Sequence, residues 1–235
     1  MSKFSIRSKE KEIMDDLDCS GPVLEQTLRE LKIINRWLGG NQVTNWGLKS
    51  LIQAAVPQSN YQVMDLGCGG GDMVAVMSRW AKKNKLSIQF IGADANAHTI
   101  EIAKQRQQEV EGVEWQVVNA FDPKFLEEQV DFVTCTLFTH HFTDEELIQL
   151  FLVLKKKAKI GFVINDLHRH PLAYYAIKWL TASFSKSPMV QNDAPLSVLR
   201  SFRRKEWRGI FQQAGLHKTK IQWRWAFRWQ IEVTI

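Results

Sequence analysis

Residues 61–72 read YQVMDLGCGGGD and join three patterns that decide the fold. An apolar run over residues 61–66 is typical of a buried strand, four glycines then fall within the five positions from Gly67 to Gly71, and a helical apolar pattern begins at Met73. Glycine lets the chain reverse sharply without a Cβ and lets a ligand lie against the backbone. The following helix points its free N–H groups at the same crevice. The stretch therefore predicts strand, tight turn and helix around a ligand site.

An acidic residue closes the next predicted strand. Residues 87–92 form a second strand pattern, which ends in Ala93-Asp94-Ala95-Asn96. In doubly wound nucleotide-binding sheets, an acid at this strand end accepts hydrogen bonds from the ribose hydroxyls. We therefore expect Asp94 to lie beside the glycine turn and to bind a ribose.

The glycine turn resembles motif I of the class I S-adenosylmethionine-dependent methyltransferases. That motif is an acidic residue, an apolar residue and then G-x-G-x-G, and residues 65–71 match all of it. The resemblance implies S-adenosyl-L-methionine as cofactor, S-adenosyl-L-homocysteine as product, and a Rossmann-like α/β fold. In that fold a doubly wound, seven-stranded, mostly parallel sheet carries an antiparallel C-terminal strand. The cofactor contacts implied here are Asp65, Gly67, Cys68, Gly69, Asp94 and Ala95.

Strand and helix patterns alternate along the middle of the chain. Strands are predicted at 61–66, 87–93, 113–118, 130–137 and 160–166, with helices near 72–84, 97–109 and 143–156. This rhythm predicts a parallel sheet with helices on both faces and a ligand at the carboxyl ends of the strands. Residues 216–235 read as two further strands around Trp223-Arg224-Trp225, and the alternation from Phe227 to Ile235 suits a half-buried antiparallel strand.

The end of the third strand offers two candidates for the adenine contact. Residues 118–122 read VNAFD, where the methyltransferase pattern has G-D-A. Alignment on Ala120 puts Asn119 at the position of the acid, and an amide oxygen can also accept a hydrogen bond from the adenine amine. Asp122 is the alternative. With either assignment, Phe121 and the flanking backbone are expected to lie against adenine.

A histidine pair follows the fourth strand, within CTLFTHHF at residues 135–142. This matches the motif IV region of the family, whose strand tip lies beside the reactive methyl group. The match implies cofactor contacts from Thr136 and Leu137 and catalytic roles for His140 and His141. The N/D-P-P-Y/F signature of enzymes that methylate amide or base nitrogens is absent from the sequence. A small-molecule acceptor that offers oxygen or carbon is therefore favoured.

Residues at and after the end of the fifth strand are expected to bind the acceptor. Period-two spacing would point Asp166, His168 and His170 to one side, and Arg169 could supply positive charge. Histidine and aspartate can also hold a metal. Because motif IV histidines are common in metal-independent members of the family, no metal is expected.

Residues 171–214 are expected to form a substrate lid. An apolar aromatic helix over 171–184 carries the candidate substrate contacts Tyr174 and Tyr175, a loop is predicted at 185–197, and a helix follows over 202–215. The resemblance implies substrate recognition in such an insertion.

Residues 1–56 show no strand pattern and are predicted to form a helical extension ahead of a methyltransferase domain at 57–235. Helices are predicted over 22–38 and roughly 46–55. The segments EIMDD and LRELKIINRWLGG resemble the N-terminal extension of bacterial small-molecule methyltransferases found alongside type III polyketide synthases. We expect the extension to pack on the sheet or to cover the cofactor crevice.

Positive charge is concentrated in the C-terminal third. Residues 155–235 carry sixteen Lys and Arg against four Asp and Glu, a net +12, and residues 1–154 carry −6, which gives the +6 of the whole chain. This third is compatible with peripheral contact with an anionic membrane. No nucleic acid partner is expected, although a module that binds RNA or a membrane surface and keeps the cofactor fold is an alternative. The sequence sets no oligomeric state.

No pattern predicts a membrane span or secretion. The apolar runs are far shorter than the roughly 20 residues that cross a bilayer, and MSKFSIRSKEKE lacks a signal-peptide core. The three cysteines are far apart and lack metal-ligand spacing, so neither a disulfide framework nor a zinc site is indicated. We therefore predict a cytoplasmic location.

Together these features predict methyl transfer from S-adenosylmethionine to a small molecule, with the hydroxyl of a phenolic or polyketide-like compound favoured. A phenol has a pKa of about 10 and an ordinary histidine one of about 6.5, so complete proton removal by histidine costs about 5 kcal/mol. The pocket must stabilise the forming phenolate, or His140 or His141 must remove the proton during methyl transfer. Methylation of a ring carbon in a quinone-like acceptor is the alternative.

Overall fold

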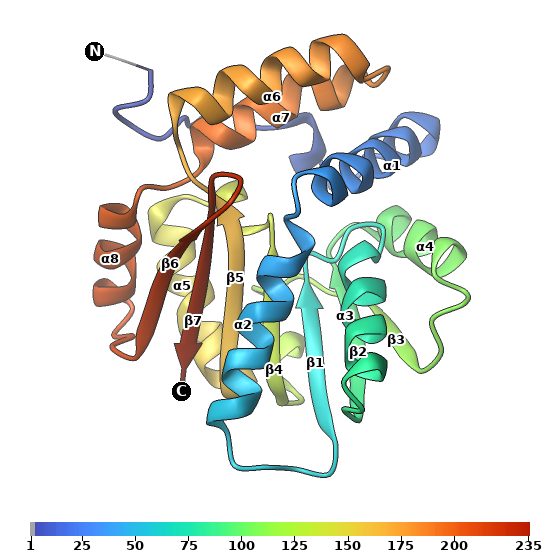
Figure 1. Cartoon of the computed structure of the whole chain (residues 1–235), viewed down its shortest axis with the longest axis vertical. Coiled ribbons are helices and arrows are strands. Elements are labelled where there is room, and N and C mark those ends of the chain that lie inside the picture. The colour runs from blue at the N-terminus through green and yellow to red at the C-terminus, as the bar shows by residue number, and fades with distance from the viewer. Residues whose placement is uncertain (1–2) are drawn as a thin grey trace.

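A seven-stranded sheet forms the centre of the computed structural model, which describes residues 3–235 (Figure 1). The strand order is β3-β2-β1-β4-β5-β7-β6, and β7 runs antiparallel to both of its neighbours while the other pairs are parallel. The order reverses between β1 and β4, which is where doubly wound sheets bind ligands. The predicted fold class is confirmed.

The observed elements agree with most of the predicted ones. The strands are β1 (Tyr61–Leu66), β2 (Ile88–Asp94), β3 (Val113–Val117), β4 (Val130–Thr136), β5 (Ala158–Leu167), β6 (Thr219–Arg224) and β7 (Arg228–Thr234). The α-helices are α1 (Gly21–Trp37), α2 (Asn41–Ala54), α3 (Asp72–Lys83), α4 (Ala97–Arg106), α5 (Asp144–Lys157), α6 (Pro171–Phe184), α7 (Pro188–Arg200) and α8 (Arg204–Gln213). Three short 3₁₀-helices are η1 (Ile13–Asp15), η2 (Pro123–Leu126) and η3 (Thr139–His141).

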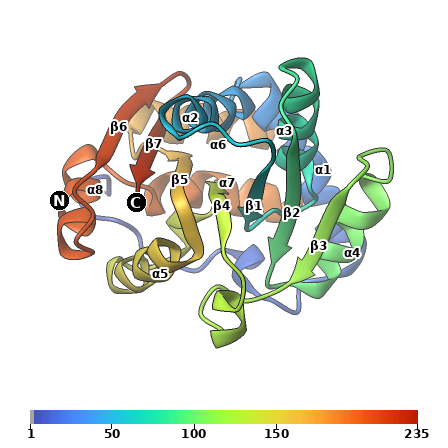
Figure 2. The same cartoon turned by 90° about the horizontal axis from the view of Figure 1, so that it is seen from below.

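Helices cover both faces of the sheet (Figure 2), and buried apolar side chains pack between the helices and each face. On one face α5 and α8 pack together, and the ring of Phe211 lies 5.0 Å from that of Phe151 and 5.5 Å from that of Trp207. On the other face α2 and α3 pack on the central strands. A Cβ on Gly47 of α2 would lie 2.5 Å from Cγ1 of Val163, so only glycine allows α2 to approach β5 this closely.

The predicted loop at residues 185–197 is wrong, because most of it belongs to α7. Ser187 caps this helix by accepting a hydrogen bond from the backbone N–H of Val190 (3.3 Å). Pro188 occupies the first turn, where its missing N–H costs little. Pro195 lies inside the helix, but Val190 and Leu196 are buried, and this packing outweighs the poor helix propensity.

Helices α1, α6 and α7 lie beyond the carboxyl ends of the parallel strands (Figure 1). Helix α8 instead packs on the sheet, so α6 and α7 are the parts of the predicted lid that reach this end of the fold. Across residues 3–235, no helix is both long enough and apolar enough to cross a bilayer.

Candidate active site

A cavity of about 1200 Å³ lies where the parallel strands end. The turns after β1, β2, β3 and β4 line one side of it, and α1, α6, α7 and the segment before α1 line the other. Ligand pockets commonly have about 300–1000 Å³. The cavity is therefore large enough for a nucleoside cofactor together with a second molecule.

The glycine turn and the carboxylate of Asp94 meet in this cavity, as predicted. Oδ2 of Asp94 accepts a hydrogen bond from the backbone N–H of Gly69 (3.1 Å), and Oδ1 accepts one from that of Asn96 (3.0 Å). Burial raises the pKa of Asp94, and these N–H donors oppose the rise. At Gly67 φ is +71°, and a Cβ there would lie 2.2 Å from the ring of Phe138. Glycine is therefore required where the turn borders the cavity.

Ten of the eleven predicted cofactor contacts line the cavity. They are Gly67, Cys68, Gly69, Asp94, Ala95, Asn119, Ala120, Phe121, Thr136 and Leu137. The exception is Asp65, which is buried and accepts a hydrogen bond from the hydroxyl of Thr134 (2.6 Å). Burial raises the pKa of Asp65 to about 7. Because Thr134 belongs to the neighbouring strand β4, Asp65 joins β1 to β4 beneath the turn.

The structure distinguishes the two candidates for the adenine contact. Asn119 lines the cavity, and its Oδ1 accepts a hydrogen bond from the backbone N–H of Phe121 (3.0 Å), which leaves a second lone pair. Asp122 does not line the cavity, and its Oδ1 accepts a hydrogen bond from the backbone N–H of Lys124 (2.9 Å) at the start of η2. This placement favours Asn119.

His140 is held by a buried carboxylate. Its Nδ1 lies 2.7 Å from Oδ1 of Asp166, and its backbone N–H donates to Oδ2 (3.0 Å), which also accepts from the hydroxyl of Thr139. Burial alone would raise the pKa of Asp166, but the charge and hydrogen bonds of His140 and Thr139 outweigh burial and lower it to about 2. An ionised Asp166 fixes Nδ1 of His140 as the donor, which leaves Nε2 free to accept a proton.

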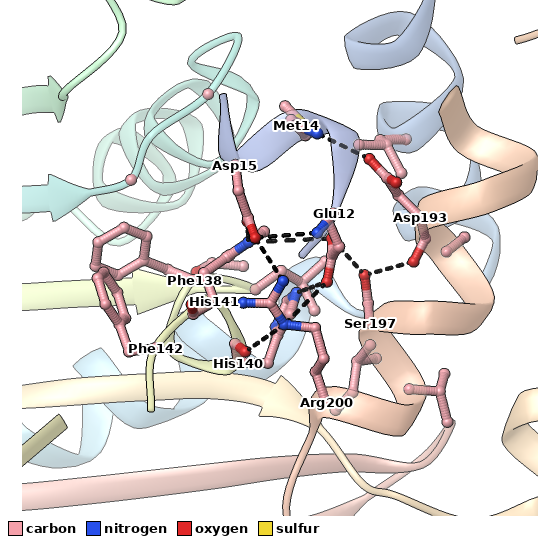
Figure 3. A pocket seen from close by; sticks show the side chains of 18 of the residues that line it. Glu12, Met14, Asp15, Phe138, His140, His141, Phe142, Asp193, Ser197 and Arg200 are labelled. Carbon is pink, nitrogen blue, oxygen red and sulfur yellow. Dashed lines mark hydrogen bonds and ion pairs between the residues drawn. The ribbon is translucent and has the colours of Figure 1, made fainter. Parts of the chain in front are cut away.

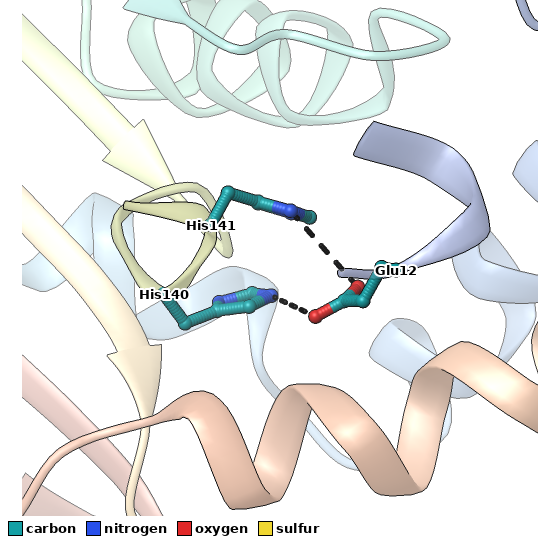
Figure 4. Close-up of side chains that lie close together, drawn as sticks. All are labelled: Glu12, His140 and His141. Atoms are coloured by element: carbon teal, nitrogen blue, oxygen red, sulfur yellow. Dashed lines mark ion pairs between the residues drawn. The ribbon is translucent and has the colours of Figure 1, made fainter. Parts of the chain in front are cut away.

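Two acidic residues that the sequence did not single out reach the histidine pair from the N-terminal segment (Figure 3). Oδ1 of Asp15 lies 2.5 Å from Nδ1 of His141. Oε1 of Glu12 lies 3.7 Å from Nε2 of His140 (Figure 4). Because Asp166 contacts the other ring nitrogen, this ring lies between two carboxylates. Burial would raise the pKa of Asp15, but His141 and Arg200 lower it to about 2.

Glu12 is the most unusual carboxylate of the site. It is buried, its Oε2 accepts a hydrogen bond from the hydroxyl of Ser197 (2.9 Å), and its Oε1 has no hydrogen-bond partner. Burial raises its pKa to about 7, although His141 and Arg200 oppose the rise. At neutral pH the side chain is therefore divided between its charged and uncharged forms.

Helix α7 holds the N-terminal segment against the histidines (Figure 3). Arg200 donates to the backbone carbonyls of His140 (3.1 Å) and His141 (2.5 Å) and to Asp15 (2.5 Å). The carboxylate of Asp193 accepts from the backbone N–H groups at the start of η1. Helices α7 and η1, neither of which was predicted from the sequence, therefore build one wall of the cavity.

The three residues Glu12, His140 and His141 have metal-ligand character, since one ligand atom from each lies within 4.8 Å of the others. The Nδ1 atom of His141 already pairs with Asp15, and the guanidinium Nε of Arg200 lies 3.8 Å from Glu12. A fixed positive charge beside the carboxylate disfavours a metal ion.

None of the five predicted substrate contacts lines the cavity. Asp166 binds His140, as described above. Arg169 is buried and fully engaged, with hydrogen bonds to the carbonyls of Phe4 and Ser201 and an ion pair with Glu206, so it cannot supply charge to an acceptor.

The other three predicted substrate contacts also lie outside the cavity lining. The His168 ring lies against Trp229, Tyr174 packs on Phe4, and Tyr175 is exposed. Burial lowers the pKa of His168 to about 4. The side chains of α6 that do line the cavity are Ala173, Ala176, Ile177, Trp179 and Leu180.

The sheet, the glycine turn and the paired Asp94 give the chain the Rossmann-like fold of the class I S-adenosylmethionine-dependent methyltransferases. Residues 63–161 match the family described as "Methyltransferase domain". Over 176 residues the chain is 30% identical to the uncharacterised methyltransferase YcgJ of Bacillus subtilis, a match that covers 73% of this chain and 63% of that protein.

Solved structures share the fold. A methyltransferase from Aquifex aeolicus superposes with a TM-score of 0.62 at 15% identity, over 90% of this chain and 98% of the other. Magnesium protoporphyrin IX methyltransferase from Synechocystis PCC 6803, solved with S-adenosylhomocysteine bound, gives a TM-score of 0.55 at 16% identity, over 85% and 84% of the two chains.

Proposed function

We propose that the chain transfers the methyl group of S-adenosylmethionine to a hydroxyl of a small molecule, of phenolic or polyketide-like character, in the cytoplasm. One observation carries the proposal. His140, which Asp166 holds from behind, borders the same cavity as the glycine turn and Asp94, so a candidate base and the proposed cofactor site share one cavity.

The residues present fit the adenosyl cofactor. When bound, S-adenosylmethionine supplies a methyl group on a positively charged sulfur that leaves as a neutral thioether. In this chain the backbone of Gly67 and Gly69 borders the cavity without side chains, and Asp94 offers a carboxylate beside them for the ribose. Asn119 and Phe121, which follow β3 and line the cavity, are the proposed contacts for adenine.

Positioning and proton removal are the contributions of this chain to the chemistry. Holding the acceptor in line with the methyl carbon contributes about 7–11 kcal/mol. The bound cofactor would supply the methyl group to the acceptor oxygen, and Nε2 of His140 would accept the hydroxyl proton that this oxygen releases. The ionised Asp166 stabilises the positive ring that results, and the carboxylate of Glu12 faces it from the other side. His141, held by Asp15, stands next to His140 with its ring centre 4.3 Å away.

The remainder of the cavity is largely apolar, which supports an aromatic or apolar acceptor. Phe138 and Phe142 lie at the histidine end, with their ring centres 4.9 Å apart. Aliphatic side chains of the covering helices α1, α6 and α7 continue the lining, among them Leu28, Leu31, Ile177, Leu180 and Val198.

A direct assay tests the proposal. The purified chain is incubated with S-adenosylmethionine labelled in its methyl group and with a panel of phenolic and polyketide-like acceptors, and labelled products are detected by mass spectrometry. Oxygen methylation is the expected result, and NMR of the product distinguishes it from carbon methylation of a quinone-like ring. If the chain binds S-adenosylhomocysteine but labels no member of the panel, the proposed acceptor class is wrong; if it binds neither cofactor nor product, the whole assignment is wrong.

Turnover is expected to rise with pH through about 7, because Glu12 is uncharged below its raised pKa and charged above it. Only the carboxylate form stabilises a protonated His140, so activity increases as Glu12 loses its proton. The variant Glu12→Gln should lack this rise and show a kcat about tenfold lower at pH 8, since a lost interaction of 1.4 kcal/mol is a tenfold change.

The measurement is kcat from pH 5.5 to 9 for both proteins. Glu10→Gln is the matched control, because Glu10 is exposed on the same segment and does not line the cavity. A pH profile that is the same in Glu12→Gln and in the unaltered chain would contradict the role of Glu12.

A further inference from the structure

Helix α6 is apolar on its exposed side. Its inner side packs on α7 and on Phe4 through buried residues such as Tyr174. On the outer side Leu172, Tyr175 and Trp179 are 65%, 57% and 71% exposed. These residues are three and four positions apart and so form one stripe on the helix, together with Ala176. A surface helix of a globular protein normally presents polar residues on this side. We call Leu172, Tyr175, Ala176 and Trp179 the outer face of α6.

Charges around the outer face are positive. The helix itself, residues 171–184, contains no Asp or Glu. Lys178 is exposed at the flank of the stripe and Lys186 is exposed just beyond its end. The ammonium group of Lys3 lies 3.6 Å from the ring centre of Tyr174 and 5.0 Å from that of Tyr175. Glu30 also contacts the end of this helix, but its carboxylate is engaged with Ser185 and with the backbone N–H of Lys186.

The outer face adjoins the mouth of the cavity. Trp179 and Ala176 belong both to this face and to the cavity lining. Trp225, in the turn between β6 and β7, is 71% exposed and also lines the cavity. In Figure 1 that turn points toward the end of the molecule that α6 covers. Two exposed tryptophans therefore stand at the margin of the cavity.

We propose that the outer face of α6 docks on an anionic membrane surface. Tryptophan and tyrosine combine an apolar body with a polar tip and concentrate at the level of lipid headgroups. An apolar helix face flanked by lysines binds in the plane of such an interface. A second copy of the chain is a poorer partner, because pairing two such faces would bring Lys178 and Lys186 of both copies together, and like charges repel.

Vesicle sedimentation tests this proposal. The full chain is mixed at low salt with vesicles of equal parts phosphatidylglycerol and phosphatidylcholine, and with vesicles of phosphatidylcholine alone. Binding is expected to the anionic vesicles and to weaken with added salt. The charge reversals Lys178→Glu and Lys186→Glu, made together, should weaken it by at least about tenfold, since each lysine near an anionic surface contributes appreciably. Lys82→Glu with Lys83→Glu is the matched control, because these exposed lysines end α3, away from α6.

A second experiment tests the contribution of the apolar residues of the outer face to vesicle binding. Leu172→Ser with Trp179→Ser should lower binding to anionic vesicles, whereas Leu152→Ser, an exposed apolar residue of α5, should not. Unchanged melting temperatures establish that the variants fold. The proposal is overturned if anionic vesicles do not bind the chain, or if face and control variants bind alike. It is also overturned if light scattering shows a dimer that Trp179→Ser dissociates, because the face would then belong to a second copy.

Discussion

Replacing His140 by asparagine is expected to lower kcat about 10²- to 10⁴-fold, the range that general-base catalysis supplies. The asparagine amide can still donate to Asp166, so that buried carboxylate keeps a partner and the fold is retained. Nothing then accepts the acceptor's proton at the position of Nε2. Affinity for S-adenosylhomocysteine should be unchanged, because the ring of His140 is hydrogen-bonded to Asp166, whereas Asp94 holds the glycine turn.

The measurements are steady-state kinetics on a methylated acceptor and calorimetry with S-adenosylhomocysteine. His98→Asn is the matched control, since His98 is exposed on α4 and does not line the cavity. If His140→Asn keeps its turnover and His141→Asn loses it, the general base is His141. If both variants remain active, neither histidine removes the proton.

Cofactor affinity is expected to fall at least about 100-fold in Asp94→Ala. In the function that we propose, the carboxylate of Asp94 accepts two ribose hydroxyls, and a hydrogen bond to a charged group is worth about 1.5–3 kcal/mol. The same variant removes the acceptor of the backbone N–H of Gly69, so the turn loses one of its anchors. Asp94→Asn keeps an acceptor for that N–H and separates the two effects.

Calorimetry with S-adenosylhomocysteine measures this loss, and thermal unfolding confirms that the variants fold. Asp122→Ala serves as the comparison, because Asp122 follows the next strand but lies outside the cavity lining. If Asp122→Ala weakened cofactor binding as much as Asp94→Ala, the residue that contacts adenine would be Asp122 and not Asn119. If Asp94→Ala bound the cofactor normally, the ribose assignment would be wrong.

Local sequence patterns predicted the sheet because each strand carries its own signal. The run from Tyr61 to Leu66 is apolar and is followed by glycines that fit a tight turn. The alternation of strands and helices predicted a parallel sheet with helices on both faces, and the family resemblance added the antiparallel C-terminal strand. Helix α7 was missed because its two prolines read locally as loop. Its helical state depends on burial against α6 and η1, which a local pattern does not contain.

The candidate site, like the fold, could be predicted from the sequence only in part. Residues at the strand ends were found because the topology brings those ends together. The residues that pair with the histidines were not predicted, because they are far away in the sequence. Asp15 and His141 are 126 positions apart, and Asp15 and Arg200 are 185 positions apart. For Arg169 the residue type suggested substrate binding, but burial commits its guanidinium to backbone carbonyls and to Glu206.

The position of Glu12 and Asp15 also bears on how the protein is handled in the laboratory. These two carboxylates sit within the first fifteen residues, yet they pair with histidines that follow β4. Proteolytic trimming that removes both carboxylates would leave the glycine turn and Asp94 in place while removing these partners of the histidines. Under the function that we propose, such a preparation would bind S-adenosylhomocysteine normally and still turn over poorly.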